Sequence, residues 1–133
     1  MAQRPNDVWR ARVEREAAEV AAGRLPAGQA YAASLFPETL LASTDAALTA
    51  FDGAIARLNP QADDEVFAVV KAVVIALNEI NEQHGGAGYE THERERLCAY
   101  IDEALTEVGV DVDALVARAG IGRWEITDEW RDW

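Results

Sequence analysis

Residues 73–108 read VVIALNEINEQHGGAGYETHERERLCAYIDEALTEV, and this stretch decides the fold. Apolar side chains recur every three to four residues on both sides of the glycines, a period typical of amphipathic helices. Gly85 and Gly86 stop the first helix, because glycine readily takes the backbone conformation that ends one. A connection this short makes the two helices antiparallel neighbours. The stretch therefore predicts a helix–turn–helix unit at the centre of the protein.

The helix before the glycines is expected at about 63–84 and is the most apolar in the chain. It begins near Asp63, since acidic residues suit the positive end of a helix dipole. One broad face of it carries Val66, Val69, Val70, Val73, Leu77 and Ile80. Valine-rich runs also suit strands, but a pattern that continues to His84 is too long for an ordinary strand. A helix this apolar is usually the central one, against which several others pack.

Capping residues and proline breaks divide the rest of the chain into further helices. In order, we expect a helix capped by Asn6 or Asp7 and stopped by Gly23, a short one that holds Tyr31 and Leu35, one capped by Ser43 or Thr44 and closed by Asn59, one capped by Thr91, and one capped by Asp111. Alternating strand patterns are nearly absent. We therefore predict an all-α fold in which residues 1–133 form a single compact bundle of five to six helices around the central apolar helix.

The charge of the chain is strongly negative and unevenly spread. The net charge is -12 for 133 residues. Residues 1–24 carry five arginines against four acids, whereas residues 25–133 carry seven bases against twenty acids. A field of this sign repels nucleic acid and anionic lipid and attracts basic partners. Binding of a basic protein is therefore one interpretation of the charge, and plain solubility is the other.

Cysteine usage and hydropathy suggest a cytoplasmic protein. Cys98 is the only cysteine, so no disulfide can form within the chain. The N-terminus is polar and lacks the apolar run of a signal peptide. No segment reaches the roughly 18 consecutive apolar residues that a membrane span needs. We expect neither a membrane nor nucleic acid among the partners.

Polar side chains crowd the turn between the two central helices. They are Asn81, His84, Glu90, His92, Glu93 and Arg94. A functional interpretation is a polar ligand pocket, or a weak divalent-metal site made by the two histidines and a glutamate. A structural interpretation is that the histidine bonds free carbonyls at the helix end and the asparagine ties down the loop. Metal-ligand spacing such as His-x-x-x-His is absent, so we assign no metal and no cofactor.

Nucleophilic motifs are missing as well. Ser34, Ser43 and Cys98 are the only serine and cysteine residues, and none lies in a Gly-x-Ser-x-Gly elbow. The glycines at 85–88 follow a helix rather than a strand, and no Lys-Ser or Lys-Thr pair follows them, which excludes an ordinary phosphate loop. We therefore do not expect an enzyme.

The C-terminal tail, residues 121–133, concentrates aromatic and acidic side chains. Three of the four tryptophans lie in its last ten residues, among four acids. A tryptophan ring can bury 150 Å² or more, as an order of magnitude. We expect Trp124, Ile126 and Trp130 to dock on the domain. The alternative is an aromatic and acidic patch that binds a basic protein, with these candidate contacts: Trp130, Trp133, Asp128, Glu129 and Tyr89.

Short motifs in the second half of the chain support the binding interpretation. Residues 74–81 (VIALNEIN), 89–91 (YET), 93–95 (ERE) and 97–101 (LCAYI) resemble small acidic bacterial proteins of uncharacterised function, some of them immunity proteins that neutralise toxins. The resemblance implies a protein-binding role without catalytic residues. We therefore expect an inhibitor, immunity or adaptor protein that acts on a basic protein. The alternatives are a small metal- or ligand-binding protein with its site at 81–94 and a self-associating structural module, and the oligomeric state stays open.

Overall fold

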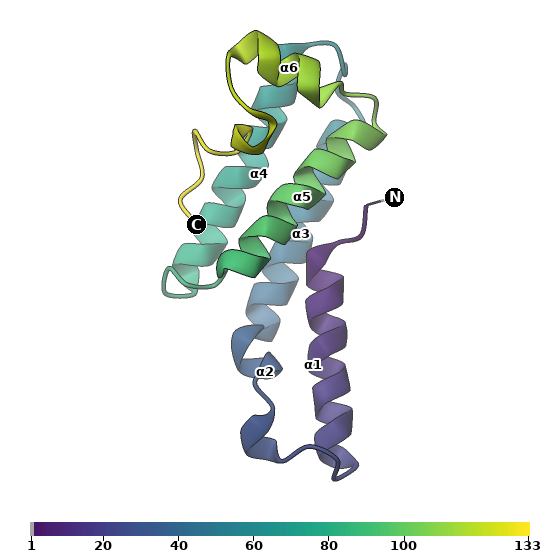
Figure 1. The fold of residues 1–133 in the computed structure, drawn as a ribbon, viewed down its shortest axis with the longest axis vertical. Helices are drawn as coiled ribbons and strands as arrows, with labels where there is room; N and C mark the ends of the chain where they lie inside the picture. The colour runs from purple at the N-terminus through teal and green to yellow at the C-terminus, as the bar shows by residue number, and fades with distance from the viewer. Residues whose placement is uncertain (1) are drawn as a thin grey trace.

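The computed structural model describes residues 2–133, which contain six α-helices, two short 3-10 helices and no strand (Figure 1). The α-helices are α1 (Pro5–Ala21), α2 (Ala32–Leu35), α3 (Glu38–Ile55), α4 (Asp63–Gln83), α5 (Thr91–Glu107) and α6 (Val112–Ala119), and the 3-10 helices are η1 (Ala27–Gln29) and η2 (Arg123–Glu125). The predicted all-α bundle is confirmed. Within the described residues, no helix has the length and apolar character that crossing a membrane requires.

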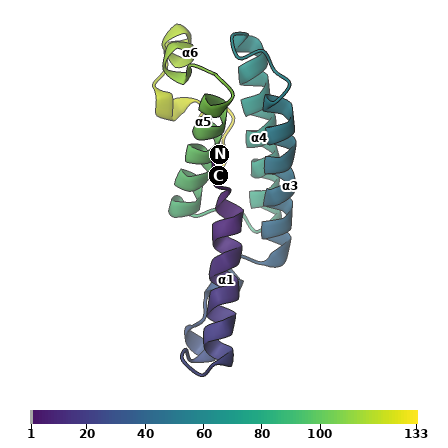
Figure 2. The ribbon, with the colours of Figure 1, turned by 90° about the vertical axis from the view of Figure 1, so that its right-hand side faces the viewer.

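The core forms where α3, α4 and α5 pack side by side and run alternately up and down (Figures 1 and 2). Val70, Val74 and Leu77 of α4 are fully buried, as are Leu97 and Ile101 of α5. Burying one such side chain contributes about 1.5–3 kcal/mol, before the entropy of ordering the chain is subtracted. The apolar face predicted for α4 is therefore the face that the other helices cover, while Ile75 on its opposite side is 39% exposed.

Several helices begin earlier than the capping residues predict. α3 begins at Glu38, directly after Pro37, and not at Ser43 or Thr44. Proline fixes a backbone angle that suits a helix start, and an acidic first residue suits the helix dipole. Thr44 is instead fully buried inside α3. The caps predicted for α1 and α5 are also wrong, since Arg4 and Glu90 occupy those positions without a side-chain bond.

The prediction for α6 is confirmed. The side chain of Asp111 accepts a hydrogen bond of 3.1 Å from the backbone N–H of Ala114. Gly120 ends the helix with a φ of 73°, in the left-handed region that favours glycine.

An arm projects from one end of the bundle and has no core of its own (Figure 2). It comprises the last part of α1 with η1, and none of its residues 10–31 is buried. Its base is held by Trp9 and Phe36, whose rings stack with centroids 5.3 Å apart. Further out, a carboxylate oxygen of Glu16 accepts hydrogen bonds from the backbone N–H groups of Tyr31 and Ala32, at 2.9 and 3.3 Å. We name this projection the α1–α2 arm, because it connects these two helices, and it is held to the rest of the protein by few contacts.

The C-terminal tail returns from α6 and lies along the second half of α4 (Figure 1). Asn78 of α4 holds it at two places. Its side-chain amide donates a hydrogen bond of 2.8 Å to the carbonyl of Trp130, and its side-chain oxygen accepts one of 2.9 Å from the N–H of Asp132. At the end, the indole N–H of Trp133 donates to the carbonyl of Val74 at 3.4 Å. The tail is thus packed against the bundle.

Candidate functional site

Asn81 organises the turn between α4 and α5. It is 4% exposed, and its side-chain oxygen accepts a hydrogen bond of 2.9 Å from the backbone N–H of Tyr89. Its backbone carbonyl accepts from the N–H groups of His84 and Gly86, at 3.1 and 3.0 Å. A buried N–H without an acceptor would destabilise the fold by about 1–3 kcal/mol. The asparagine therefore ties down the loop that follows α4.

His84 closes the C-terminal end of α4 and links it to α3. Its Nδ1 lies 2.8 Å from the carbonyl oxygen of Ile80, so Nδ1 must carry the hydrogen that this carbonyl accepts. In the neutral ring, Nε2 is then the acceptor, and it receives the hydroxyl hydrogen of Thr39 at 3.0 Å. Both ring nitrogens are engaged in bonds within the fold.

The other four candidates of the turn lie just before α5 or in its first turn, and they face different sides. Glu90 and His92 are exposed, Glu93 is 8% exposed and Arg94 is half-buried. His92 and Glu93 line a groove between α1 and α5, whereas Arg94 lines a pocket between α5 and the tail. Nowhere in residues 2–133 could a group of three or more His, Cys, Asp or Glu side chains hold a metal ion. The structure therefore does not bring the two histidines and a glutamate together as a set of metal ligands at the turn.

Tyr89 lies in the core and not on the surface, where a partner would contact it. It is 2% exposed, its hydroxyl lies 2.5 Å from the hydroxyl of Thr44, and its ring contacts those of Trp9 and Trp133. Burial raises the pKa of Tyr89 to about 12, so the hydroxyl stays neutral. Its role in this structure is to join the loop before α5 to α3, α1 and the tail.

The tryptophans of the tail divide into docked and exposed rings. Trp133 is 7% exposed and is covered by the guanidinium of Arg131, 5.4 Å from the ring centroid. Trp130 is half-buried and contacts the ring of Phe67 edge-on, with centroids 6.5 Å apart. Trp124, which we expected to dock, is 79% exposed. Hydrophobicity predicts that tryptophan rings are buried, but it does not predict which of them the backbone can bring to the core.

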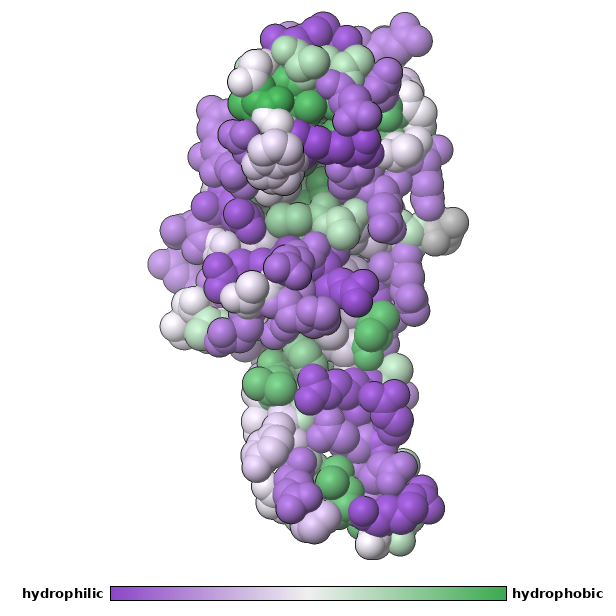
Figure 3. Space-filling view, viewed as in Figure 1, coloured by the Kyte–Doolittle hydropathy of each residue, from purple (hydrophilic) through white to green (hydrophobic). Residues whose placement is uncertain are grey.

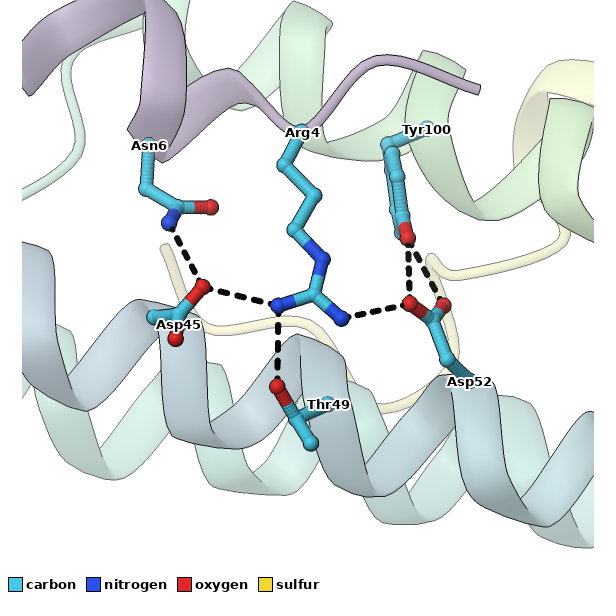
Figure 4. A network of polar contacts seen from close by, with 6 residues as sticks. All are labelled: Arg4, Asn6, Asp45, Thr49, Asp52 and Tyr100. Atoms are coloured by element: carbon cyan, nitrogen blue, oxygen red, sulfur yellow. Dashed lines mark hydrogen bonds and ion pairs between the residues drawn. The ribbon is translucent and has the colours of Figure 1, made fainter. Parts of the chain in front are cut away.

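A polar clamp that the sequence analysis missed joins the N-terminal segment to α3 and α5 (Figure 4). Arg4 donates hydrogen bonds to Asp45, Thr49 and Asp52 of α3, at 2.7, 2.8 and 2.7 Å. The hydroxyl of Tyr100 on α5 donates to both oxygens of Asp52, at 2.7 and 2.8 Å. The signal was present in the sequence, since residues 45, 49 and 52 form a polar stripe at helical spacing on a largely apolar helix.

The electrostatics of this clamp keep its groups in complementary charge states. Burial alone would lower the pKa of Arg4, but its bonds to Asp52 and Asp45 outweigh burial and raise it. The same contact lowers the pKa of Asp45. Burial raises the pKa of Tyr100 to about 12, and its hydrogen bond to Asp52 acts in the same direction. At neutral pH the clamp is therefore a cation between carboxylates, with a neutral phenol as an additional hydrogen-bond donor. This arrangement stabilises the contact between the N-terminal segment, α3 and α5 and does not suit proton transfer.

Two hollows flank α5. The larger, the α1–α5 groove, has a volume of about 870 Å³ and is lined by Val8, Trp9, Arg12, Phe36, Glu93 and Arg96 among others. Figure 3 shows apolar side chains near this groove, at the narrow waist where the arm leaves the bundle. The smaller, the α5–tail pocket, has a volume of about 480 Å³; Thr91, Arg94 and Cys98 line it from α5, and Trp124, Thr127 and Arg131 from the other side.

A third surface, which we name the acidic tail face, forms where the tail crosses α4. It comprises the exposed carboxylates of Glu79, Glu82, Glu129 and Asp132, together with Ile75 and Trp130. Asn78 places the tail beside these α4 residues, because it binds the tail at residues 130 and 132, while Ile75 and Glu82 lie one helical turn before and after it on α4. None of the four carboxylates forms an ion pair with any other side chain in the described part of the chain. Asp128 differs, since it lies 3.2 Å from Arg131.

Comparisons with protein-family models, curated proteins and solved structures found no match to this chain. The resemblance to small acidic immunity-type proteins therefore stays a prediction.

Proposed function

We propose that this protein is a non-catalytic binding protein that holds a basic protein partner on its acidic tail face. The observation that carries the proposal is the group of four exposed carboxylates without an ion pair, beside an isoleucine that is 39% exposed and a half-buried tryptophan. Unpaired carboxylates accelerate the encounter with a cationic surface. Apolar and aromatic side chains then supply the contact that slows dissociation.

The positions of the predicted contact residues refine this proposal. Glu129 and Trp130 belong to the face itself, and Asp128 lies next to it with part of its charge offset by Arg131. Tyr89 and Trp133 are buried, so in the proposal they support the tail from below and do not touch the partner. Inhibitor, immunity and adaptor proteins could all use a face of this kind.

The test is retention of proteins from a cell lysate at low and high salt, followed by mass spectrometry. Wild-type protein is compared with a variant in which the four carboxylates are neutralised: Glu79→Gln, Glu82→Gln, Glu129→Gln and Asp132→Asn. We expect wild type to retain a protein of basic isoelectric point at low salt and to release it at high salt, because salt screens the attraction. The fourfold variant should retain little of it.

A matched control separates the location of the charges from their number. The control variant removes the same four charges from exposed carboxylates elsewhere that also lack ion pairs: Asp7→Asn, Glu14→Gln, Glu90→Gln and Glu103→Gln. Retention of the same basic protein by this control, but not by the tail-face variant, would support the proposal. Equal loss in both variants would reduce it to a general effect of net charge, and retention unchanged in both would remove it.

A further inference from the structure

The α5–tail pocket has features of a ligand site that the proposed partner face does not use. Its volume of about 480 Å³ lies within the range of about 300–1,000 Å³ that is common for small-molecule sites. In Figure 3 it is seen as a hollow with a pale-green floor bordered by purple side chains. Its lining combines the apolar side chains of Ala99 and Ile126 and the thiol of Cys98 with charged side chains of both signs, Glu95 and Asp102 among them.

One of these groups, Arg94, has donors without acceptors. Its Nε atom is buried and has no hydrogen-bond partner, and the guanidinium makes no ion pair with any residue from 2 to 133. Only one other buried side-chain atom in the described chain, Oδ1 of Asn6, is unsatisfied in this way. A buried guanidinium N–H without an acceptor is unfavourable, and such groups usually have a water or an ion as their partner. The Nη atoms of Arg94, which lines the pocket, also have no partner among the described residues, so they are the donors that a ligand in the pocket could reach.

A second guanidinium is held in the same pocket by contacts that leave donors free. The guanidinium of Arg131 lies over the ring of Trp133, 5.4 Å from its centroid, and only Nη2 reaches a carboxylate, that of Asp128 at 3.2 Å. Its Nη1 lies 3.8 Å from the Sγ atom of Cys98, a weak acceptor. By contrast, Arg123 is fully engaged, since it binds Asp102 through two hydrogen bonds of 2.7 and 2.6 Å. Arg94 and Arg131 are thus the cations of this pocket that could bind an anion.

Two further features suit an organic anion. Thr91 is the first residue of α5, so the positive end of this helix dipole lies at the pocket. Trp124 is 79% exposed, and one part of its ring rests on the backbone of Gly122, where an added Cβ would lie 2.7 Å from the ring. The ring therefore meets the backbone along one part, while much of its surface stays open to a planar group.

We propose that the α5–tail pocket binds a small organic anion with a planar ring. Its carboxylate or phosphate oxygens accept hydrogen bonds from Arg94 and Arg131, a geometry that the planar guanidinium favours for both groups. Its ring lies on Trp124. The net charge of -12 opposes the approach of anions at long range, but this repulsion is screened beyond about 8 Å at physiological ionic strength. The short-range bonds in the pocket therefore decide the affinity.

The experiment measures the binding of three probes by calorimetry: inorganic phosphate, benzoate and phenyl phosphate. We expect the two ring-bearing anions to bind wild type more tightly than inorganic phosphate does. Arg94→Gln should weaken them by about tenfold or more, the effect of losing one hydrogen bond to a charged group. Trp124→Ala should weaken the ring-bearing probes and leave inorganic phosphate unchanged.

The matched control is Arg96→Gln. Arg96 carries the same charge on the same helix and also lacks an ion pair among the described residues, but it lines the α1–α5 groove and not this pocket. It should bind the probes as wild type does. The proposal is overturned if none of the three probes binds, if Arg94→Gln and Arg96→Gln weaken binding equally, or if Trp124→Ala has no effect. Circular dichroism of each variant shows that it is folded, and Arg94→Lys, which keeps the charge without the planar donors, should weaken binding as well.

Discussion

The single residue Asn81 accounts for much of the geometry of the α4–α5 turn. Replacing it by alanine removes the acceptor of the buried Tyr89 N–H and leaves space beside Gly88, where an added Cβ would lie 3.5 Å from the side-chain oxygen of Asn81. We expect Asn81→Ala to lower the free energy of unfolding by about 1–3 kcal/mol, as for other buried donors left unpaired. Urea denaturation measures this directly.

The neighbouring Gln83 provides the comparison. It lies on the same helix, two residues away, and is exposed. Gln83→Ala should change the stability by no more than about 0.5 kcal/mol. Equal effects of the two substitutions would show that the Asn81–Tyr89 bond has no special weight in the turn.

Two tryptophans of the tail also differ at the scale of the residue. Trp133 is 7% exposed and contacts Tyr89, Arg131 and Val74, whereas Trp124 is 79% exposed. Trp133→Ala should cost about 3–5 kcal/mol, the usual effect of removing a large buried ring. Trp124→Ala should change stability by less than about 0.5 kcal/mol. Thermal and urea unfolding of both variants tests this, and a Trp133→Ala variant as stable as wild type would mean that the tail does not dock in solution.

At the scale of the element, the α1–α2 arm depends on few contacts. Glu16 is the side chain that joins the start of α2 to α1, through two backbone N–H groups. Glu16→Ala should therefore speed amide hydrogen exchange in residues 24–36 while exchange in α4 stays slow, because the arm can open without the core. Glu14→Ala, an exposed residue of the same helix, serves as the control and should leave exchange unchanged. Faster exchange throughout the protein would instead mean that arm and core unfold together.

The beginnings of the helices show where sequence patterns compete. Ser43 and Thr44 have the chemistry of helix caps, yet Pro37 starts α3 and brings both residues inside it. The capping preference is a local free energy of about 1 kcal/mol, and burial of an apolar face outweighs it. Asp111 at α6 is followed by an apolar helix and faces no such competitor, so there the capping prediction is correct.

For the whole molecule, periodic patterns predict the architecture well and the contacts between distant segments poorly. The apolar face of α4 could be read from residues 66–80, because helical spacing alone determines it. The sequence does not predict that Arg94 faces a different hollow from His92 and Glu93, because this depends on where α1 and the tail meet α5. The clamp of Arg4 spans more than forty residues to Asp45 and Asp52, and no local pattern on the N-terminal segment marks its partners.

The acid response of the whole molecule follows from carboxylates that arginines hold in their charged form. Asp45, Glu38 and Asp63 have lowered pKa values, chiefly through hydrogen bonds from arginine side chains. In the unfolded chain these groups titrate near pH 4, so near that pH the folded protein binds fewer protons than the unfolded one. Their contribution to stability is therefore fully present above about pH 4 and is lost as the pH falls through the lower folded values. Because these three side chains are between 34% and 70% exposed, solvent screens their ion pairs, so each contributes little and the loss is gradual. Urea midpoints of the wild-type protein, measured from pH 6 down to pH 2, should show this decline. The variant Asp45→Asn, whose side chain cannot titrate, should be less stable than wild type at pH 6 and should lose less stability on acidification. Parallel curves for the two proteins would mean that the contact between Arg4 and Asp45 contributes nothing to the acid response.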